Sequence, residues 1–152
     1  MKVLILGSTG MLGDAVASVF KNFNGQVICS SRRTMGESSD CSDIRVFDAS
    51  KDRIEEIASD LTTGDYIINC IGIIKTEIDE SSRESCARAK QINEEFPAAL
   101  AAFAEGKGVR VIQIATDCVF SGKAGHYSES SKHDPEDIYG KTKSAGEIIS
   151  GS

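Results

Sequence analysis

The chain has 152 residues, of which 40% are hydrophobic and 26% are charged, a composition ordinary for one globular domain with a single core. Its formal net charge of −6 argues against binding to nucleic acid or to anionic membranes, because both need a positive surface. No apolar run approaches the roughly 20 residues that span a bilayer. The apolar stretch at 3–6 is also too short for a signal peptide.

The cysteine pattern bears on the compartment and on metal binding. The five cysteines are odd in number and include no CxxC pair or His-rich neighbour, so neither a disulfide framework nor a zinc site is indicated, and no metal is expected. Three of them lie in or just after apolar runs, where cysteine behaves as a small hydrophobic residue: Cys29, Cys70 and Cys118. We therefore expect a reducing, cytoplasmic compartment. The two histidines, His126 and His133, are expected at the surface.

Short apolar runs alternate along the chain with stretches of helical periodicity. In chain order we expect a strand at 3–6, a helix at 11–23, strands at 26–29 and 45–47, a helix at 54–61, a strand at 66–71, a helix at about 82–105, a strand at 109–114, a polar loop at 121–137 and a helix at 137–150. Pro97 falls inside the longest helix and predicts a kink or a restart there.

This alternation predicts a parallel sheet with helices on both faces. Right-handed crossovers then favour a doubly wound arrangement. The predicted fold class is therefore α/β, a three-layer Rossmann-type doubly wound parallel sheet forming one domain over residues 1–152.

A glycine-rich loop follows the first strand and opens the first helix. Glycines in such a turn let the backbone approach a pyrophosphate, and the helix N-terminus supplies N–H groups for it. The context therefore favours a dinucleotide-binding loop over a mere tight turn. The predicted cofactor contacts are Gly7, Thr9, Gly10, Met11, Leu12 and Gly13.

The end of the second strand, Ser31-Arg32-Arg33, carries two arginines where NAD-binding proteins usually have an acidic residue for the ribose 2′-hydroxyl. Guanidinium groups suit a 2′-phosphate, so NADP(H) is predicted, with Arg32 as the main contact, over a solvated basic pair. Asp48, with Ala49 beside it, follows the third strand. The sequence leaves open whether Asp48 binds the adenine amino group, caps the next helix or is a solvated turn residue.

Tyr139 and Lys143 stand one helical turn apart. A phenol that exchanges a proton near neutral pH needs a nearby positive charge. Thr116 ends the fifth strand, where open α/β sheets bind ligands, and is predicted to hydrogen-bond a carbonyl or hydroxyl of the substrate. Taken alone, the Tyr–Lys pair is more typical of an amphipathic helix surface, and Thr116 is more typical of a helix or turn cap; their order behind a glycine loop favours the catalytic interpretation.

Segments spread over nearly the whole chain resemble extended short-chain dehydrogenases/reductases, and most closely their dTDP-4-dehydrorhamnose reductase-like branch. These segments are GSTGMLG (7–13), NCIGIIK (69–75), INEEFPAALA (92–101), ATDCVFSG (115–122) and YGKTKSAGE (139–147). The resemblance implies an NADPH-dependent reductase of a 4-keto sugar nucleotide in cell-surface polysaccharide biosynthesis.

The resemblance also implies roles for individual residues. Tyr139 would protonate the keto oxygen of the sugar as NADPH delivers hydride, with Thr116 and Lys143 completing the catalytic set. Lys143 would also hold the nicotinamide ribose, and Asn93 would support this lysine through water. The backbone lying along the cofactor would be that of Cys70, Ile71 and Gly72.

Two departures from the family qualify these expectations. Cys118 stands where the family often has Tyr, and if that tyrosine contacts the substrate in relatives, its replacement is expected to change which sugar the site accepts. Members usually run to nearly twice this length, so we expect the fold to be incomplete at its C-terminal end, without the substrate-binding half, and the 152-residue piece alone to be inactive. A homodimer is left open. The alternative functions are an NAD-dependent sugar-nucleotide epimerase or dehydratase, and a non-catalytic dinucleotide-binding regulatory module.

Overall fold

The computed structural model describes residues 1–33 and 41–148. The chain divides into two compact units. The first comprises Met1–Ile71 and Ala99–Ile114, and the second comprises Gly72–Ala98 and Ala115–Ser152. Helix α4 (Phe96–Lys107) begins in the second unit and continues into the first.

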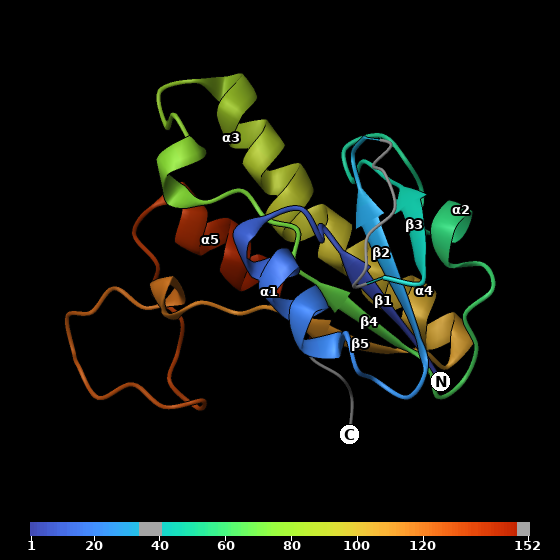
Figure 1. The fold of residues 1–152 in the computed structure, drawn as a ribbon. Helices are drawn as coiled ribbons and strands as arrows, with labels where there is room; N and C mark the ends of the chain where they lie inside the picture. Colours follow the sequence, from blue (N-terminus) through green and yellow to red (C-terminus); the bar gives the residue numbers. More distant parts are fainter. Residues whose placement is uncertain (34–40, 149–152) are drawn as a thin grey trace. The chain divides into compact units, whose positions relative to one another are not determined.

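A five-stranded parallel sheet forms the centre of the first unit, with the strand order β3-β2-β1-β4-β5 (Figure 1). The strands are β1 (Lys2–Leu6), β2 (Gln26–Ser31), β3 (Asp43–Val46), β4 (Tyr66–Asn69) and β5 (Arg110–Gln113). The chain builds outward from β1 through β2 to β3, then returns to the other side of β1 with β4. This reversal is the topology of a doubly wound Rossmann-type sheet, and it confirms the predicted fold class.

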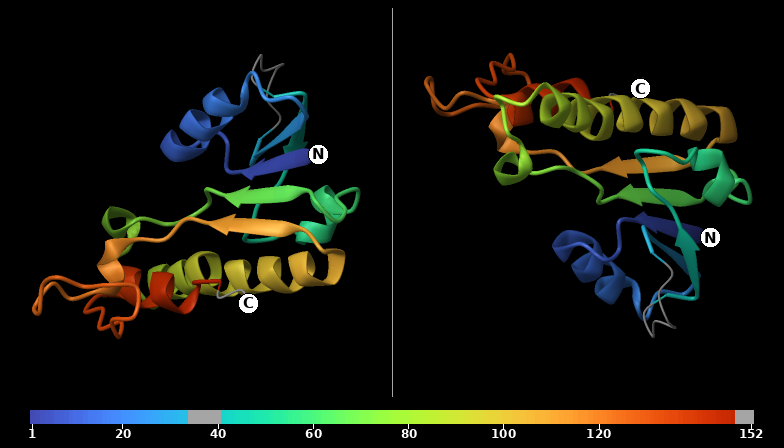
Figure 2. Two further views of the ribbon diagram at one scale, coloured as in Figure 1. Left: turned by 90° about the horizontal axis from the view of Figure 1, so that it is seen from below. Right: turned by 90° about the horizontal axis from the view of Figure 1, so that it is seen from above.

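Helices cover both faces of this sheet. Figure 2 shows α1 (Met11–Phe20) on one face and α4 on the other. Residues Val3–Leu6 of β1 are almost fully buried as a result, which explains their unbroken apolar run. On the α1 side, Ala17 packs with Val3, Ile5 and Val27 in one hydrophobic cluster. The short helix α2 (Ile54–Ala58) precedes β4.

The second unit is helical. It contains η1 (Lys75–Glu77), α3 (Arg83–Lys90), the π-helical turn η2 (Gln91–Glu95), the start of α4, η3 (Asp117–Val119) and α5 (Ile138–Ala145). Pro97 lacks the N–H that would donate to the carbonyl of Asn93 in a regular α-helix. The helix widens into a π-turn just before this proline and then restarts as α4, so the predicted restart is confirmed.

Several element ends differ from those predicted. Helix α1 ends at Phe20 rather than at 23, and α5 ends at Ala145, with Gly146 as its C-cap, rather than at 150; residues 149 and 150 lie outside the described residues. Between α5 and η3, residues 121–136 form neither helix nor strand, as expected for a loop. Neither the 3₁₀ turns η1 and η3 nor the π-turn η2 was predicted as such.

The two histidines of the second unit have different surroundings. His126 is exposed, as expected, with a positive φ of 50°. His133 is not simply a surface residue, as its Nδ1 lies 2.8 Å from the Ser144 hydroxyl and its ring packs edge-on against Phe120 with a centroid separation of 5.1 Å. The prediction was wrong for His133 because its partners are 11 and 13 residues away, so the local sequence does not reveal them.

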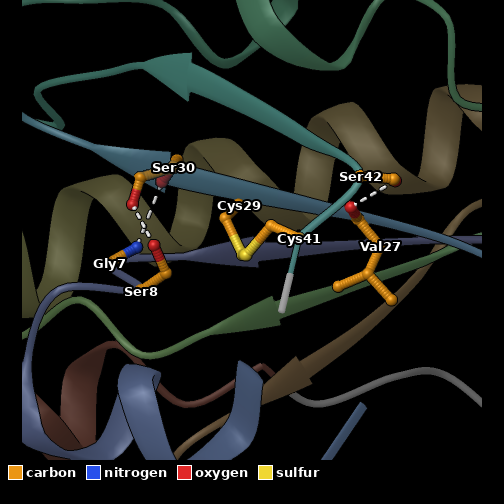
Figure 3. The surroundings of a disulfide bond; sticks show 7 residues. All are labelled: Gly7, Ser8, Val27, Cys29, Ser30, Cys41 and Ser42. Atoms are coloured by element: carbon orange, nitrogen blue, oxygen red, sulfur yellow. Dashed lines mark hydrogen bonds between the residues drawn. A yellow bond between two sulfur atoms is a disulfide. The ribbon is translucent and has the colours of Figure 1, made fainter. Parts of the chain in front are cut away.

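The expectation that no disulfide forms is corrected in the first unit. Cys29 in β2 is bonded to Cys41, with their Cα atoms 5.9 Å apart (Figure 3). Cys41 lies just before β3, whose residues Asp43 and Ile44 pair with Ile28 and Cys29 of β2, so the chain enters β3 close to the strand that carries Cys29. An odd number of cysteines without a spacing motif carries no information on connectivity, which is why this pair was missed.

Candidate functional site

The loop after β1 has the close-packed geometry that its glycines require. Gly7 has a φ of +76°, in the left-handed region that favours glycine. A Cβ at Gly13 would lie 2.1 Å from the Gly7 carbonyl oxygen, so only glycine lets α1 start this close to the loop. Gly10 is the N-cap of α1 and provides no side-chain cap, which leaves the first N–H groups of the helix available to an anion.

This glycine loop is fixed to its neighbours in the sheet. The Gly7 N–H donates to the Ser30 hydroxyl at 3.1 Å, and both the N–H and the hydroxyl of Ser8 donate to the Ser30 carbonyl at 3.0 Å (Figure 3). A Cβ at Gly7 would lie 2.9 Å from Cγ1 of Ile71. The loops after β1 and β4 therefore meet where the strand order reverses, the position at which open α/β sheets bind ligands. Ser30 was not among the predicted site residues.

A cavity of about 580 Å³ lies beside this loop, lined by five residues that the sequence marked as cofactor contacts: Thr9, Ser31, Arg32, Arg33 and Asp48. The Ser31 hydroxyl donates to the carbonyl of Arg33 at 2.6 Å and accepts from its N–H at 3.1 Å. These bonds fix the turn that carries both arginines. Two guanidinium groups at one cavity suit a phosphate ligand.

Asp48 has a structural role as well as a place in the cavity wall. Its Oδ1 accepts from the Ser50 hydroxyl at 2.6 Å and from the Ser50 N–H at 3.0 Å, and these bonds hold the pKa of Asp48 below its usual value. Helix α2 starts only at Ile54, with Arg53 at its N-cap, so the helix-cap interpretation was wrong. Asp48 is a turn residue whose side chain also faces the cavity.

Other predicted cofactor residues lie outside the cavity lining formed by the described residues. Met11 and Leu12 begin α1 and are 94% and 42% exposed, an unusual exposure for apolar side chains. Ala49 lies in the Asp48 turn. Cys70 donates its N–H to the Leu6 carbonyl at 3.1 Å, and burial raises the pKa of its thiol.

In the second unit, α5 carries the predicted tyrosine and lysine. Lys143 is buried, with 8% of its surface exposed, and this burial lowers the pKa of its ammonium group, against an opposing influence of Glu147. Lysine is rarely buried this deeply, and a lysine with a lowered pKa is a candidate functional group. Tyr139 is half-buried one turn earlier, and no side chain of the described residues hydrogen-bonds to its hydroxyl.

The N-terminus of α5 is held by charged residues that the sequence reading did not single out. Asp137 is the N-cap and accepts from the Gly140 N–H at 2.7 Å, and its other oxygen lies 2.7 Å from Nζ of Lys75. The Gly140 bond and the Lys75 charge lower the pKa of Asp137. Oε1 of Glu80 accepts from the Ile138 N–H at 3.0 Å. An Asp at a helix start is a known capping signal, but Lys75 and Glu80 had no such signal.

Asn93 joins α5 to the segment after β4. Its Oδ1 accepts from the Ile73 N–H and its Nδ2 donates to the Ile73 carbonyl, both at 2.9 Å, and Nδ2 also lies 3.4 Å from the Thr142 hydroxyl. A Cβ at Gly72 would lie 3.5 Å from Oδ1 of Asn93. Asn93 is thus a buried positioning residue for the helix that carries Tyr139. Its support of Lys143 through water remains a prediction.

Thr116 lies next to that helix. Its hydroxyl accepts from the Cys118 N–H at 3.3 Å and caps η3, so the turn-cap interpretation is confirmed, and a role toward substrate remains a prediction. A Cβ at Gly140 would lie 2.3 Å from the Cys118 carbonyl oxygen. The glycine after Tyr139 therefore lets α5 pack directly against the segment that contains Thr116. Four predicted residues of the second unit therefore lie on elements that pack against one another, namely η3, α5 and η2. These residues are Thr116, Tyr139, Lys143 and Asn93.

Two features are absent from the described part of the chain. No cluster of three or more His, Cys, Asp or Glu side chains there has the arrangement needed for a metal ion. None of its helices combines the length and the apolar character required to cross a membrane.

Comparison with known proteins places these features in a family context. Residues 1–149 match the family described as RmlD substrate binding domain. The chain is 31% identical over 146 residues to methionine adenosyltransferase 2 subunit beta of Xenopus laevis, covering 96% of this chain and 41% of the relative. It is 29% identical over 145 residues to dTDP-4-keto-6-deoxy-D-glucose reductase of Streptomyces niveus, covering 95% and 45%.

The same likeness extends to solved structures. A dTDP-4-dehydrorhamnose reductase from Clostridium acetobutylicum superimposes with a TM-score of 0.74 at 30% identity, covering 96% of this chain and 47% of that chain. The chain therefore spans less than half the length of each of these relatives.

Proposed function

Because the chain belongs to the RmlD substrate binding domain family, we propose that it is the cofactor-binding part of an NADPH-dependent reductase acting on a 4-keto sugar nucleotide. The observation that carries this proposal is the packing of α5 through Gly140 onto the segment after Thr116, with Lys143 buried one turn beyond Tyr139. We further propose that the protein acts in the cytoplasm, in cell-surface polysaccharide biosynthesis, and that residues 1–152 form one NAD(P)-binding domain.

The first unit offers the features that a phosphorylated dinucleotide needs. The glycine loop presents the uncapped N-terminus of α1 to a pyrophosphate. Arg32 and Arg33 line the cavity beside it and would pair with a 2′-phosphate, which favours NADP(H) over NAD(H). Met11 and Leu12, exposed at the start of α1, offer apolar surface to the same ligand. When bound, the nicotinamide would supply the hydride that reduces the carbonyl carbon.

The second unit would supply the proton. The Tyr139 hydroxyl donates its proton to the keto oxygen of the sugar, and the Lys143 ammonium stabilises the phenolate that remains. The Thr116 hydroxyl holds the same oxygen and so favours the charge that develops on it. Asp137, Glu80 and Asn93 contribute by fixing α5, because catalysis depends on keeping such groups in position.

Two other functions would use parts of the same site. A sugar-nucleotide epimerase or dehydratase would use the same tyrosine and lysine but would retain its nicotinamide cofactor through the cycle. The likeness to methionine adenosyltransferase 2 subunit beta favours a second candidate, a dinucleotide-binding subunit without its own turnover. A likeness in fold does not decide between them.

The test is turnover by the full-length protein with NADPH and a dTDP-linked 4-keto-6-deoxy sugar. We expect stoichiometric formation and release of NADP⁺ with consumption of the keto sugar. The Tyr139→Phe variant should lower kcat by roughly 10²- to 10⁴-fold and leave NADPH binding nearly unchanged. Tyr66→Phe, which alters a tyrosine hydroxyl in the first unit, is the matched control and should turn over normally.

Three results would contradict the proposal in different ways. Tightly retained NAD⁺ with no net oxidation would point to an epimerase or dehydratase. NADPH binding without turnover of any keto sugar would point to the subunit role. Full activity of the Tyr139→Phe variant would show that Tyr139 is not the general acid.

A further inference from the structure

The disulfide of the first unit is anchored in β2 two residues before Ser31, which lines the arginine-lined cavity. Cys29 is 1% exposed in β2, and only Ser30 separates it from the Ser31-Arg32-Arg33 turn. Cys41 lies at the far end of the same connection between β2 and β3. The bond therefore ties β2, three residues before the first cavity arginine, to the residue at the start of the approach to β3.

Hydrogen bonds between β2 and the residue before β3 hold the two cysteine positions near one another independently of the disulfide. Ser42, next to Cys41, donates its N–H and its hydroxyl to the Val27 carbonyl at 2.8 and 2.6 Å (Figure 3). Ser30, next to Cys29, accepts the bonds from Gly7 and Ser8 that fix this end of β2 to the glycine loop. Two thiols kept this close form a disulfide readily, because little further loop closure is needed.

From this arrangement we propose that Cys29 and Cys41 form a reversible thiol–disulfide modification site that sets the affinity of the neighbouring cavity for a 2′-phosphorylated dinucleotide. The inference rests on the proposed function for the role of Arg32 and Arg33. The covalent link at Cys29 restrains the end of β2 from which the arginine turn departs before the ligand arrives, and such preorganisation strengthens binding. The disulfide form is therefore the tight-binding form, and the dithiol form is the weak-binding form.

The exchange chemistry starts at Cys41, which is half-buried, whereas Cys29 is almost inaccessible. The Cys41 thiolate attacks a low-molecular-weight disulfide such as oxidised glutathione, and one glutathione thiolate leaves. The Cys29 thiolate then attacks the Cys41 sulfur of the mixed disulfide, and the second glutathione leaves. Two protein thiols lose two protons and two electrons, and one glutathione disulfide becomes two thiols. A thiol reductant reverses both steps.

The test measures dissociation constants of NADPH and NADH for the full-length protein after oxidised glutathione and after dithiothreitol, with the linkage checked by peptide mass. We expect NADPH binding at least about 5-fold tighter in the disulfide form, at the low end of typical coupling between sites. NADH lacks the 2′-phosphate and should change less than about 2-fold. Cys41→Ser should bind like the reduced protein in both conditions, and Cys86→Ser, a control at a free cysteine, should respond like wild type.

The outcomes separate this proposal from the proposed function. If NADPH is preferred over NADH to the same degree in both redox states, the modification site is refuted and the cofactor assignment stands. If neither form distinguishes the two dinucleotides, or neither form binds NADPH, both fail. If no Cys29–Cys41 linkage forms under oxidant, the modification site is refuted whatever the cofactor. The comparison of redox states in the wild type needs no variant, so it holds even if Cys41→Ser does not fold.

Discussion

Gly146 lies directly against the backbone carbonyl of Asn93. A Cβ at Gly146 would stand 1.8 Å from that oxygen and 2.9 Å from its carbon, distances that no real pair of atoms tolerates. Asn93 belongs to the π-turn before Pro97, and Gly146 is the C-cap of α5. The C-terminal end of α5, the helix that carries Lys143, is therefore packed onto the π-turn η2.

A methyl group at this contact should separate the two helices. We expect Gly146→Ala to lower the free energy of unfolding by about 1–3 kcal/mol, the usual cost of overpacking. Chemical denaturation measures this loss. Gly106→Ala is the matched control, because a Cβ there meets nothing within 4 Å and alanine is the better helix former, by up to about 1 kcal/mol. Equal stability of Gly146→Ala and wild type would contradict this prediction, because it would show that the two backbones can move apart at little cost.

The N-cap of α5 predicts a dependence of stability on pH. The pKa of Asp137 is lowered by the Gly140 N–H and by Lys75, so its carboxylate stabilises the folded state. This contribution is fully present above the unfolded value of about 3.9 and is lost as pH falls through the lower, folded-state pKa. We expect Asp137→Asn, which keeps an oxygen acceptor at the cap, to show a flatter decline in stability below pH 4.

Two further variants separate the cap from the ion pair in the same measurement. Asp137→Ala removes the acceptor and should cost about 0.5–2 kcal/mol near neutral pH. Lys75→Met removes only the ion pair, whose lysine is well exposed, and should cost less than the loss of the cap. A Lys75→Met variant less stable than Asp137→Ala would contradict this order.

Lys143 should reduce the stability of the protein at neutral pH. Burial lowers the pKa of its ammonium group, so the folded state is penalised wherever the unfolded lysine is charged. The penalty is complete below the folded-state pKa and disappears as pH rises to the unfolded value of about 10.4. We expect Lys143→Met to gain about 0.5–2 kcal/mol at pH 7, a common range for stabilising substitutions, and to abolish reductase turnover.

The control for this effect is Lys141→Met on the exposed side of the same helix, which should leave stability nearly unchanged. Unfolding measured at pH 7 and at pH 10 tests the sign, because the gain of Lys143→Met should shrink at the higher pH. A loss of stability at pH 7 would mean that the contacts of the ammonium group outweigh the cost of its burial.

The features that the sequence predicted correctly are local or periodic. The apolar run Val3–Leu6 predicts a buried strand from its own composition. Pro97 predicts a disturbed helix because proline itself lacks the backbone N–H. The sequence also predicted Arg32 and Arg33 as cofactor contacts, because the turn after the second strand has a fixed place in this fold; both line a cavity, and their contact with a cofactor stays a prediction.

The features that it missed depend on residues far apart in the chain. The Cys29–Cys41 bond joins residues that are 12 positions apart in the sequence. The contacts of Asn93 reach Ile73 and Thr142, which are 20 and 49 residues away. Lys75 meets Asp137 only through the fold of the second unit. None of these partners is marked by spacing or periodicity, so the three-dimensional arrangement was needed to find them.

The cavity arginines give the sharpest prediction for the cofactor. Arg32→Ala in the full-length protein should remove a charge-assisted contact to the 2′-phosphate, which costs about 1.5–3 kcal/mol of binding free energy. This loss corresponds to a dissociation constant for NADPH that is roughly 10- to 100-fold larger. NADH binding should stay within about 2-fold, since that cofactor has no phosphate for the arginine to meet. Arg53→Ala is the control, because Arg53 is equally charged but pairs with Glu55 and does not line the cavity. Fluorescence titration with both dinucleotides provides the measurement. If Arg32→Ala weakens the binding of NADPH and NADH alike, the arginine stabilises the turn after β2 and does not bind the 2′-phosphate. If it weakens neither, the NADP assignment fails at this position, and Arg33→Ala must carry the whole preference for the assignment to survive.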